Sequence, residues 1–244
     1  MDFVRALGLD TGLTAVVGAG GKKSSIYAAA AALDRAVITT TVRIPPFDDH
    51  VAELHRTADP ATTLETVEEW PVGLVPAHEE NRYLGYDPAV VEGIASSSVP
   101  QAVLVKADGA RNRDLKAPGE DEPRIPGSAD RVLGLASVQA VGEPLSESWV
   151  HRIGRVAELT GLEPGAEIGV EDVATVLSSP AGTEKGVPDS AEYLPVLNKV
   201  DDVADRAVAR EIADLVLERG RADRVALTHL LGTGEPLIEV RTSS

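Results

Sequence analysis

Residues 14–25, TAVVGAGGKKSS, join a short apolar run to a glycine-rich turn that carries two lysines. The run at 14–17 predicts a buried strand, and the alanine-rich segment that continues to Leu33 predicts a helix. A glycine turn between a strand and a helix brings backbone N–H groups and the positive end of the helix dipole to one point, which favours an anion such as phosphate. We therefore expect a phosphate site built by Gly18, Ala19, Gly20, Gly21, Lys22, Lys23, Ser24 and Ser25.

The spacing within this turn narrows the kind of phosphate site. Lys23 stands where the dinucleotide fingerprint GxGxxG requires its third glycine, and Val16 stands where the Walker pattern GxxxxGK[ST] requires its first. With both standard patterns excluded, the turn matches a shortened phosphate-binding pattern, GxxGK, formed by Gly18, Gly21 and Lys22. Lys23 also replaces the hydroxyl that normally binds Mg²⁺, so either Ser24 or Ser25 substitutes for it or the second ammonium replaces part of the metal's charge. The alternative interpretation is that the segment binds no phosphate and is only a glycine-rich turn with two solvated lysines.

The remaining apolar runs predict the fold class. A β-branched run at 37–42 ends before Pro45 and Pro46, and with the first strand and helix it predicts a right-handed βαβ unit with parallel strands. Further strands are expected at 102–107, 131–138, 193–197 and 225–229, and helices at 88–95, 147–159, 171–177 and 203–218. This alternation predicts an α/β fold with a doubly wound, mostly parallel sheet and helices on both faces. We expect a single domain over 1–244, with a long functional loop at 109–127 that is rich in proline, glycine and charge.

The composition excludes several classes of function. The chain has 244 residues, a net charge of −16 and no cysteine, which excludes disulfides and cysteine-ligated metals. Its negative charge repels nucleic acid, and no run approaches the ~20 apolar residues that cross a bilayer, so neither partner is expected. No signal peptide is predicted, and the expected compartment is the cytoplasm. The acidic excess favours a surface adapted to high salt, as in halophilic archaea; an ordinary acidic bacterial protein is the alternative.

A second group of candidates follows the predicted strand at 102–107. Ligands of open α/β sheets bind beyond the carboxyl ends of strands, and Asp108 has the position of a Walker B aspartate that holds Mg²⁺. Lys106, one pleat earlier, is expected on the same side, and the alternative is a purely structural Lys106–Asp108 salt bridge. Arg111, Arg113 and Lys116 form a basic cluster suited to a second phosphate or a carboxylate, unless they are solvated loop charges.

Two further patterns lie at strand ends. Asn198, Lys199 and Asp201 match the NKxD pattern that recognises guanine; alternatively, Asp201 caps the helix expected near 203. Thr39, Thr40 and Thr41 close the second strand near the place of a γ-phosphate or metal, although a plain β-branched strand explains them nearly as well. The five histidines show no zinc spacing.

Four segments together resemble a known family: VVGAGGKKSS, AVITTTVRI, AVLVKADGARNRDLKAP and GVPDSAEYLPVLNKVD. In this order and spacing they are similar to the YqeC family of selenium-dependent hydroxylase accessory proteins, over about residues 14–229. The resemblance implies a P-loop NTPase fold and a role in maturing molybdenum hydroxylases that carry a labile selenium-containing cofactor. Family members usually have GGKT and Glu-Ala-Asp-Gly where this chain has Lys23 and Lys106. Either the two lysines replace Mg²⁺ and its anionic ligand, or this copy binds nucleotide without hydrolysis or has lost the site.

These observations predict a protein that binds GTP or ATP, with guanine favoured and Mg²⁺ left open. Lys22, Asp108 and Arg111 are the expected catalytic residues, with Asp108 positioning metal or water. Asn198, Lys199 and Asp201 would bind the base, and a second ligand would meet Thr39, Thr40, Thr41, Arg111 and Lys116. The alternatives are a non-hydrolysing scaffold for the hydroxylase or its cofactor, and a small-molecule kinase acting on an acidic acceptor.

Overall fold

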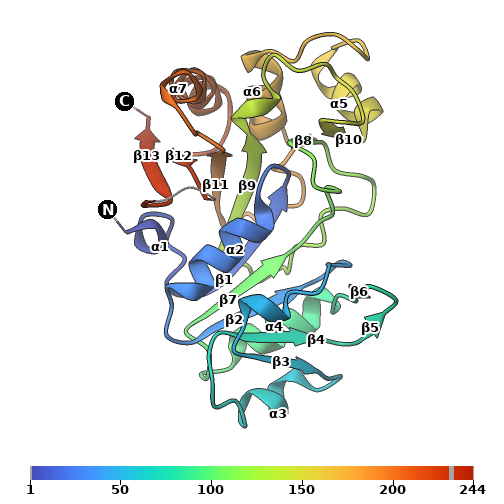
Figure 1. Cartoon of the computed structure of the whole chain (residues 1–244), viewed down its shortest axis with the longest axis vertical. Coiled ribbons are helices and arrows are strands. Elements are labelled where there is room, and N and C mark those ends of the chain that lie inside the picture. The colour runs from blue at the N-terminus through green and yellow to red at the C-terminus, as the bar shows by residue number, and fades with distance from the viewer. Residues whose placement is uncertain (1, 231–233, 244) are drawn as a thin grey trace.

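The computed structural model describes residues 2–230 and 234–243, and within them most of the strands form one large sheet (Figure 1). This sheet has nine strands in the order β13-β12-β11-β9-β1-β7-β2-β4-β3 over the described residues. Neighbours are parallel except for the antiparallel pair β12 and β13. In chain order the strands are β1 (Gly12–Gly18), β2 (Ala36–Thr40), β3 (Glu53–Arg56), β4 (Val72–Val75), β7 (Ala102–Lys106), β9 (Arg131–Ser137), β11 (Glu192–Asn198), β12 (Arg224–Thr228) and β13 (Leu237–Thr242).

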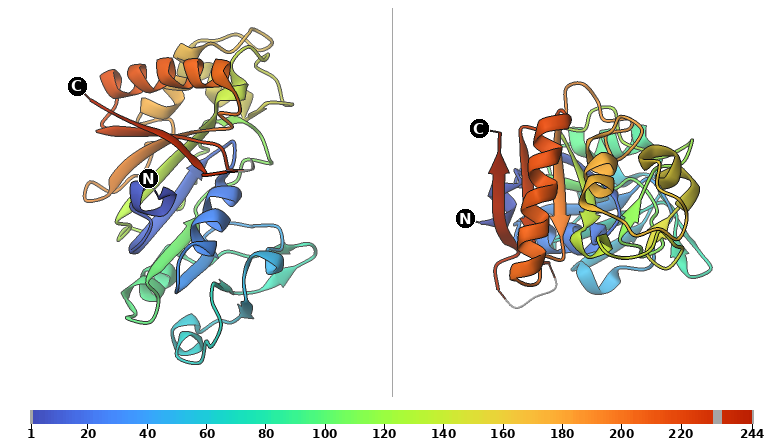
Figure 2. Two further views of the ribbon diagram at one scale, coloured as in Figure 1. Left: turned by 60° about the vertical axis from the view of Figure 1, so that its left-hand side comes forward. Right: turned by 90° about the horizontal axis from the view of Figure 1, so that it is seen from above.

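Helices cover both faces of this sheet, as the sequence predicted (Figure 2). Alternate residues of β1 point to opposite faces: Val16 belongs to the core under the N-terminal helices, and Ala15 and Val17 belong to the core on the other side. The first face carries α1 (Phe3–Ala6) and α2 (Lys22–Ala31). The second carries α3 (Pro60–Leu64), α4 (Pro88–Ser96), α6 (Val170–Ser178) and α7 (Val203–Arg219), with α5 (Ile153–Thr160) packed on α6. The protein is therefore a doubly wound α/β fold.

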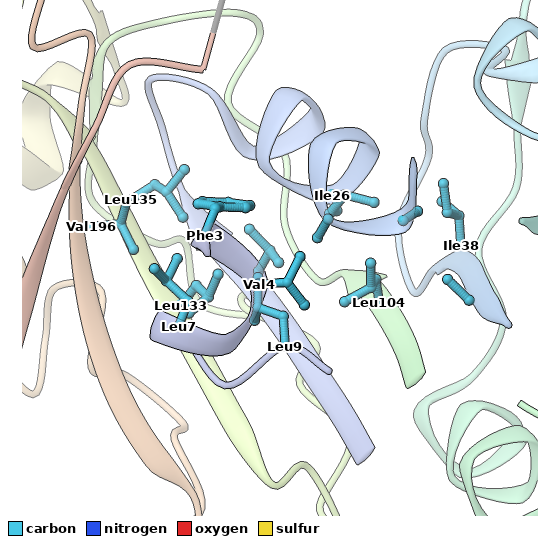
Figure 3. Close-up of a cluster of buried hydrophobic side chains, with 14 of the residues drawn as sticks. Phe3, Val4, Leu7, Leu9, Ile26, Ile38, Leu104, Leu133, Leu135 and Val196 are labelled. Atoms are coloured by element: carbon cyan, nitrogen blue, oxygen red, sulfur yellow. The ribbon is translucent and has the colours of Figure 1, made fainter. Parts of the chain in front are cut away.

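The apolar cluster beneath α1 and α2 fixes the helix that follows the glycine turn (Figure 3). Phe3 and Val4 of α1 lie with Ile26 of α2 against Leu104 of β7 and Leu135 of β9, and all five are buried. The position of α2 is thus set by contacts on both sides of β1. Because β1 lies between β7 and β9, its carboxyl end is where the chain changes direction across the sheet, the usual place for a ligand in open α/β folds.

Three sequence predictions need correction. The strands β3 and β4, which extend the sheet beyond β2, and β13 at the opposite edge were not expected. The helix expected at 147–159 begins only at Ile153, because Arg152 has a left-handed φ of 66° and the preceding pair Val150–His151 forms β10. That strand pairs in parallel with β8 (Leu115–Lys116), so part of the segment expected to be loop at 109–127 is a buried strand.

Smaller elements complete the description. The strands β5 (His78–Glu79) and β6 (Arg82–Tyr83) form a separate antiparallel hairpin. Two short 3₁₀ helices are η1 (Asp48–His50) and η2 (Val138–Ala140). Within the described part of the chain, no helix combines the length and apolar character needed to traverse a lipid bilayer.

Candidate functional site

The glycine turn between β1 and α2 is held in a conformation that glycine permits. Gly18, Gly20 and Gly21 have φ values of 91°, 76° and 131°, which lie in the region that residues with a Cβ rarely adopt. Asn198 Nδ2 donates to Gly20 O over 2.7 Å, and a Cβ at Gly21 would overlap that same nitrogen. The turn is therefore shaped by direct contact with the carboxyl end of β11.

The amides of this turn divide into two sets. Those of Gly18, Ala19 and Gly20 donate to Asp108 Oδ2, Leu135 O and Arg113 O, at 3.0, 2.9 and 2.9 Å. The N-terminus of α2, by contrast, has no side-chain cap, and Gly21, Lys22, Lys23 and Ser24 line the pocket described below. An anion would thus meet the amides at the start of α2, whereas the three earlier amides hold the turn in place.

Asp108 lies beneath the turn between two lysines. Its Oδ1 is 3.1 Å from Lys22 Nζ and its Oδ2 is 2.7 Å from Lys116 Nζ, with all three side chains buried. Lys22 Nζ also donates to Gly18 O. The contact of Asp108 Oδ1 with Lys22 is an ion pair, and no group among the described residues donates a hydrogen bond to this oxygen. Burial lowers the pKa of Lys22, although the charge of Asp108 opposes the shift.

The salt-bridge network continues from Lys116 to α5. Glu122 Oε2 is 2.5 Å from both Lys116 Nζ and Arg152 Nη1. Burial would raise the pKa of Glu122, but hydrogen bonds from Arg152 and Lys116 lower it to about 2. Burial, followed by the positive charges of Arg152 and Lys116, lowers the pKa of the neighbouring His151 to about 4. Glu122 and Arg152 were not predicted as site residues, because Glu122 lies in the segment expected to be loop and Arg152 in one expected to be helix, neither at the end of a predicted strand.

A cavity of about 540 Å³ opens beside the glycine turn, and we call it the cationic pocket. Among its sixteen lining residues the only acid is Asp114, which pairs with Lys199 Nζ at 2.5 Å. Eight of the others are cations: Lys22, Lys23, Arg43, Arg82, Lys106, Arg111, Arg113 and Lys199. This concentration of positive charge, in a chain of net charge −16, gives the pocket an electrostatic potential that favours anions.

Lys106 faces this pocket and forms no salt bridge with Asp108, so the alternative of a purely structural Lys106–Asp108 pair is wrong. Its Nζ donates to Arg43 O over 3.3 Å, and the oxygens of Asp108 are taken by Lys22 and Lys116. Burial, followed by the nearby charge of Lys22, lowers the pKa of Lys106 to about 7. A buried lysine of this kind exchanges its proton near neutral pH.

The three threonines expected to face a second ligand use their hydroxyls within the fold. Thr39, Thr40 and Thr41 donate to Leu74 O, Lys106 O and Arg124 O, at 2.8, 2.9 and 2.7 Å. All three are buried and do not line the cationic pocket. Lys116 likewise lies beneath it, whereas Arg111, at a left-handed φ of 50°, lines it.

The segment 198–201 contributes mainly to the shape of the turn. Asn198 bridges Gly20 to Thr228, whose hydroxyl donates to Asn198 Oδ1 over 3.0 Å. Lys199 lines the pocket, whereas Asp201 lies outside it and accepts from Gln139 Nε2 at 2.8 Å while contacting His229 Nδ1 at 2.5 Å. The cap of α7 is Asp202, which accepts from Asp205 N at 2.8 Å, so the alternative role assigned to Asp201 is wrong by one residue.

Comparison with known proteins identifies the family. The family model described as "YqeC protein" matches residues 14–154, more than half of the chain. The chain belongs to the YqeC family. A curated relative, "Uncharacterized protein YqeC" of Escherichia coli (strain K12), is 29% identical over 203 residues, which cover 80% of this chain and 78% of the relative. The match to the YqeC model includes the glycine turn, the Asp108 network and every cation of the pocket except Lys199.

The residues of this YqeC family member do not fit a Mg²⁺ site. The residue after Lys22 is a lysine, and Asp108 is enclosed between two ammonium groups. Across residues 2–230 and 234–243, no group of three or more histidines and acids could hold a metal ion. Mg²⁺ in nucleotide sites usually has one or two carboxylate ligands. Ser24 lines the pocket and could offer a hydroxyl, but the one acid among the described lining residues, Asp114, is paired with Lys199.

Proposed function

We propose that this YqeC family member binds the phosphates of a nucleoside triphosphate, GTP or ATP, in the cationic pocket. The observation that carries the proposal is the charge of that pocket, where eight Lys or Arg side chains and one acid surround about 540 Å³ at the end of β1. The excess of cations matches a ligand with several negative charges. The uncapped N-terminus of α2 adds backbone donors on the same wall.

The proposal gives each residue a role in binding. Lys22 would transfer its contact from Gly18 O to a phosphate oxygen while remaining against Asp108. Lys199 and Arg111 would contact the ligand from other walls of the pocket, and Asp108 would position Lys22. Asp201 would read guanine only after releasing Gln139 or His229, so the proposal rests on the phosphates and leaves the base to experiment.

Isothermal titration with GTP, ATP and inorganic tripolyphosphate tests the proposal. Replacing Lys22 with methionine should weaken binding of all three by at least about tenfold, because a charge-assisted contact to phosphate is lost. The matched control is Arg219→Met, which removes one exposed positive charge at the far end of α7. Unchanged affinity in Lys22→Met, or no binding by the unmodified chain, would contradict the proposal.

A second candidate function is phosphoryl transfer to an acidic small molecule. The observation in its favour is that Arg43 and Arg82 line the pocket from the segment after β2 and from β6, apart from the glycine turn. Such cations suit a phosphate or carboxylate on an acceptor. Release of phosphate by the protein alone favours an NTPase, and dependence on an added acidic acceptor favours a kinase. If the protein binds nucleotide but hydrolyses it only after a protein partner is added, the result favours a scaffold.

The wider role that we propose is maturation of a selenium-dependent molybdenum hydroxylase in the cytoplasm, where nucleoside triphosphates are available. What supports it is the resemblance of the four sequence segments to proteins with that role. Copurification of a tagged chain with a molybdenum hydroxylase from its own cells, enhanced by nucleotide and lost in Lys22→Met, tests this role. Hydroxylase of full activity in cells that lack the chain would argue against it.

A further inference from the structure

We propose that the cationic pocket takes the triphosphate as a free polyanion without Mg²⁺, with Lys23 and Lys106 supplying the positive charge that the metal usually provides. This inference rests on the proposed function and goes beyond it by stating the form in which the ligand binds. Its support lies in the donor set at the places where a P-loop site normally holds its metal.

The first of these places is the residue after the P-loop lysine. A serine or threonine there offers a hydroxyl to Mg²⁺ in Walker-type sites. Here it is Lys23, in the first turn of α2, and its side chain lines the pocket. An ammonium at this point repels a divalent cation and attracts the phosphate oxygens that the cation would have bridged.

The second place is the aspartate at the end of β7. Asp108 is 1% exposed, and its two oxygens face the ammonium groups of Lys22 and Lys116. To bind Mg²⁺ it would have to leave at least one of these partners in the buried interior. Among the described residues of the pocket wall Asp114 is the only acid, and it is held by Lys199 at 2.5 Å. A phosphate-bound metal would therefore find no free carboxylate on the described wall of this pocket.

The third observation is the state of Lys106. This side chain is buried and lines the pocket. Within the described chain its Nζ donates a hydrogen bond to the carbonyl oxygen of Arg43, over 3.3 Å. Lys22 and Lys116 are both near enough for their charges to disfavour its protonated form. A phosphate beside Lys106 reverses this balance, so the ligand should draw a proton onto the amine as it binds.

The experiment compares the affinity for ATP, GTP and tripolyphosphate in chelator with that in excess MgCl₂, at matched ionic strength. We expect binding to be at least about tenfold tighter in chelator, because Mg²⁺ neutralises ligand charge that the pocket is built to meet. Binding that requires Mg²⁺ would overturn this inference while leaving the proposed function intact. No binding under either condition would overturn both.

Two variants test whether Lys23 and Lys106 are the cause. Lys23→Thr restores the hydroxyl of a Walker-type site and should reduce the chelator-to-Mg²⁺ affinity ratio by about tenfold or more. Lys106→Met should reduce the same ratio, and the control Arg219→Met should leave it unchanged. A ratio that stays the same in Lys23→Thr and Lys106→Met would overturn the assignment.

Proton uptake gives an independent measurement. Near pH 8, titrations in buffers of different ionisation enthalpy should show uptake approaching one proton on binding in chelator, because Lys106 is then mostly neutral before the ligand arrives. Lys106→Met should abolish that uptake. Equal uptake in the variant and the unmodified chain would contradict the role of this lysine.

Discussion

Replacing Lys106 with methionine should stabilise the free protein while it weakens triphosphate binding. Burial, followed by the charge of Lys22, lowers the pKa of this lysine from 10.5 to about 7. Since one pKa unit corresponds to about 1.4 kcal/mol, the folded chain at pH 7 carries a penalty of roughly 4 kcal/mol relative to the unfolded chain. Methionine is similar in length and uncharged, so it removes the penalty and leaves little cavity. We expect the free energy of unfolding to rise by about 2–4 kcal/mol, and the Tm by roughly 4–16 °C.

The pH dependence distinguishes this mechanism from a general improvement in packing. Because the pKa of Lys106 is lower in the folded chain, between about pH 7 and 10.5 the unfolded chain holds a proton that the folded chain lacks. The stability of the unmodified protein should therefore rise with pH across this window. The advantage of Lys106→Met should be largest below pH 7 and should vanish toward pH 10.5. Urea unfolding at a series of pH values measures both curves, and Arg219→Met is the control.

The result that would refute this reasoning is a Lys106→Met protein that is less stable at pH 7, or one whose advantage is the same at every pH. The first outcome would mean that the side chain packs or bonds more favourably than its single 3.3 Å contact with Arg43 O indicates. The second would mean that the gain comes from apolar contacts and not from a lost charge.

Three further predictions concern the turn, the salt-bridge network and the surface. Gly21→Ala should lower the free energy of unfolding by about 1–3 kcal/mol and weaken phosphate binding, because φ at this position is 131° and the new Cβ would overlap Asn198. Urea unfolding measures the first effect and isothermal titration the second. Glu122→Gln should reduce stability at neutral pH and flatten its loss in acid, since the pKa of Glu122 is about 2 and its contribution disappears as pH falls from 4.5 toward 2; thermal unfolding across that range gives the comparison. Raising KCl from ~0.1 M to ~1 M should raise the Tm by screening the net charge of −16, and a constant Tm would contradict adaptation to high salt.

The parts of the fold that the sequence predicted are those whose strands are buried on both faces. In β1 and β7 nearly every residue is buried, and such strands appear in the sequence as continuous apolar runs. The strand β3 reads Glu-Leu-His-Arg and is only half-buried at the edge of the sheet, so its residues give no comparable signal. The strand β4 is buried but is four residues long and contains Gly73, which makes it too short to recognise by pattern.

The absence of a Lys106–Asp108 salt bridge has a specific geometric cause. Strand alternation places residues two apart on the same side, which predicted Lys106 beside Asp108. The strand β7 ends at Lys106, so the alternation does not extend to Asp108. One of its two actual partners, Lys116, is brought to the aspartate by β8. The pairing of β8 with β10 joins residues 35 positions apart: Leu115 with Val150 and Lys116 with His151. No local pattern encodes a contact of that kind, and the same holds for Arg43 and Arg82 in the pocket.

The distribution of lysine supports the proposal that the cationic pocket binds an anion. The chain contains six lysines among its 244 residues. Lys22, Lys106 and Lys116 are buried together, although lysine is rarely buried fully, and Lys23 and Lys199 join Lys22 and Lys106 on the wall of the cationic pocket. The sixth, Lys185, bonds to the carbonyls of Gly119 and Glu120. Stability alone would favour apolar residues at the buried positions, and solubility alone would favour lysines spread over the surface. The position of four of the six lysines on the wall of one cavity is explained when that cavity binds an anion.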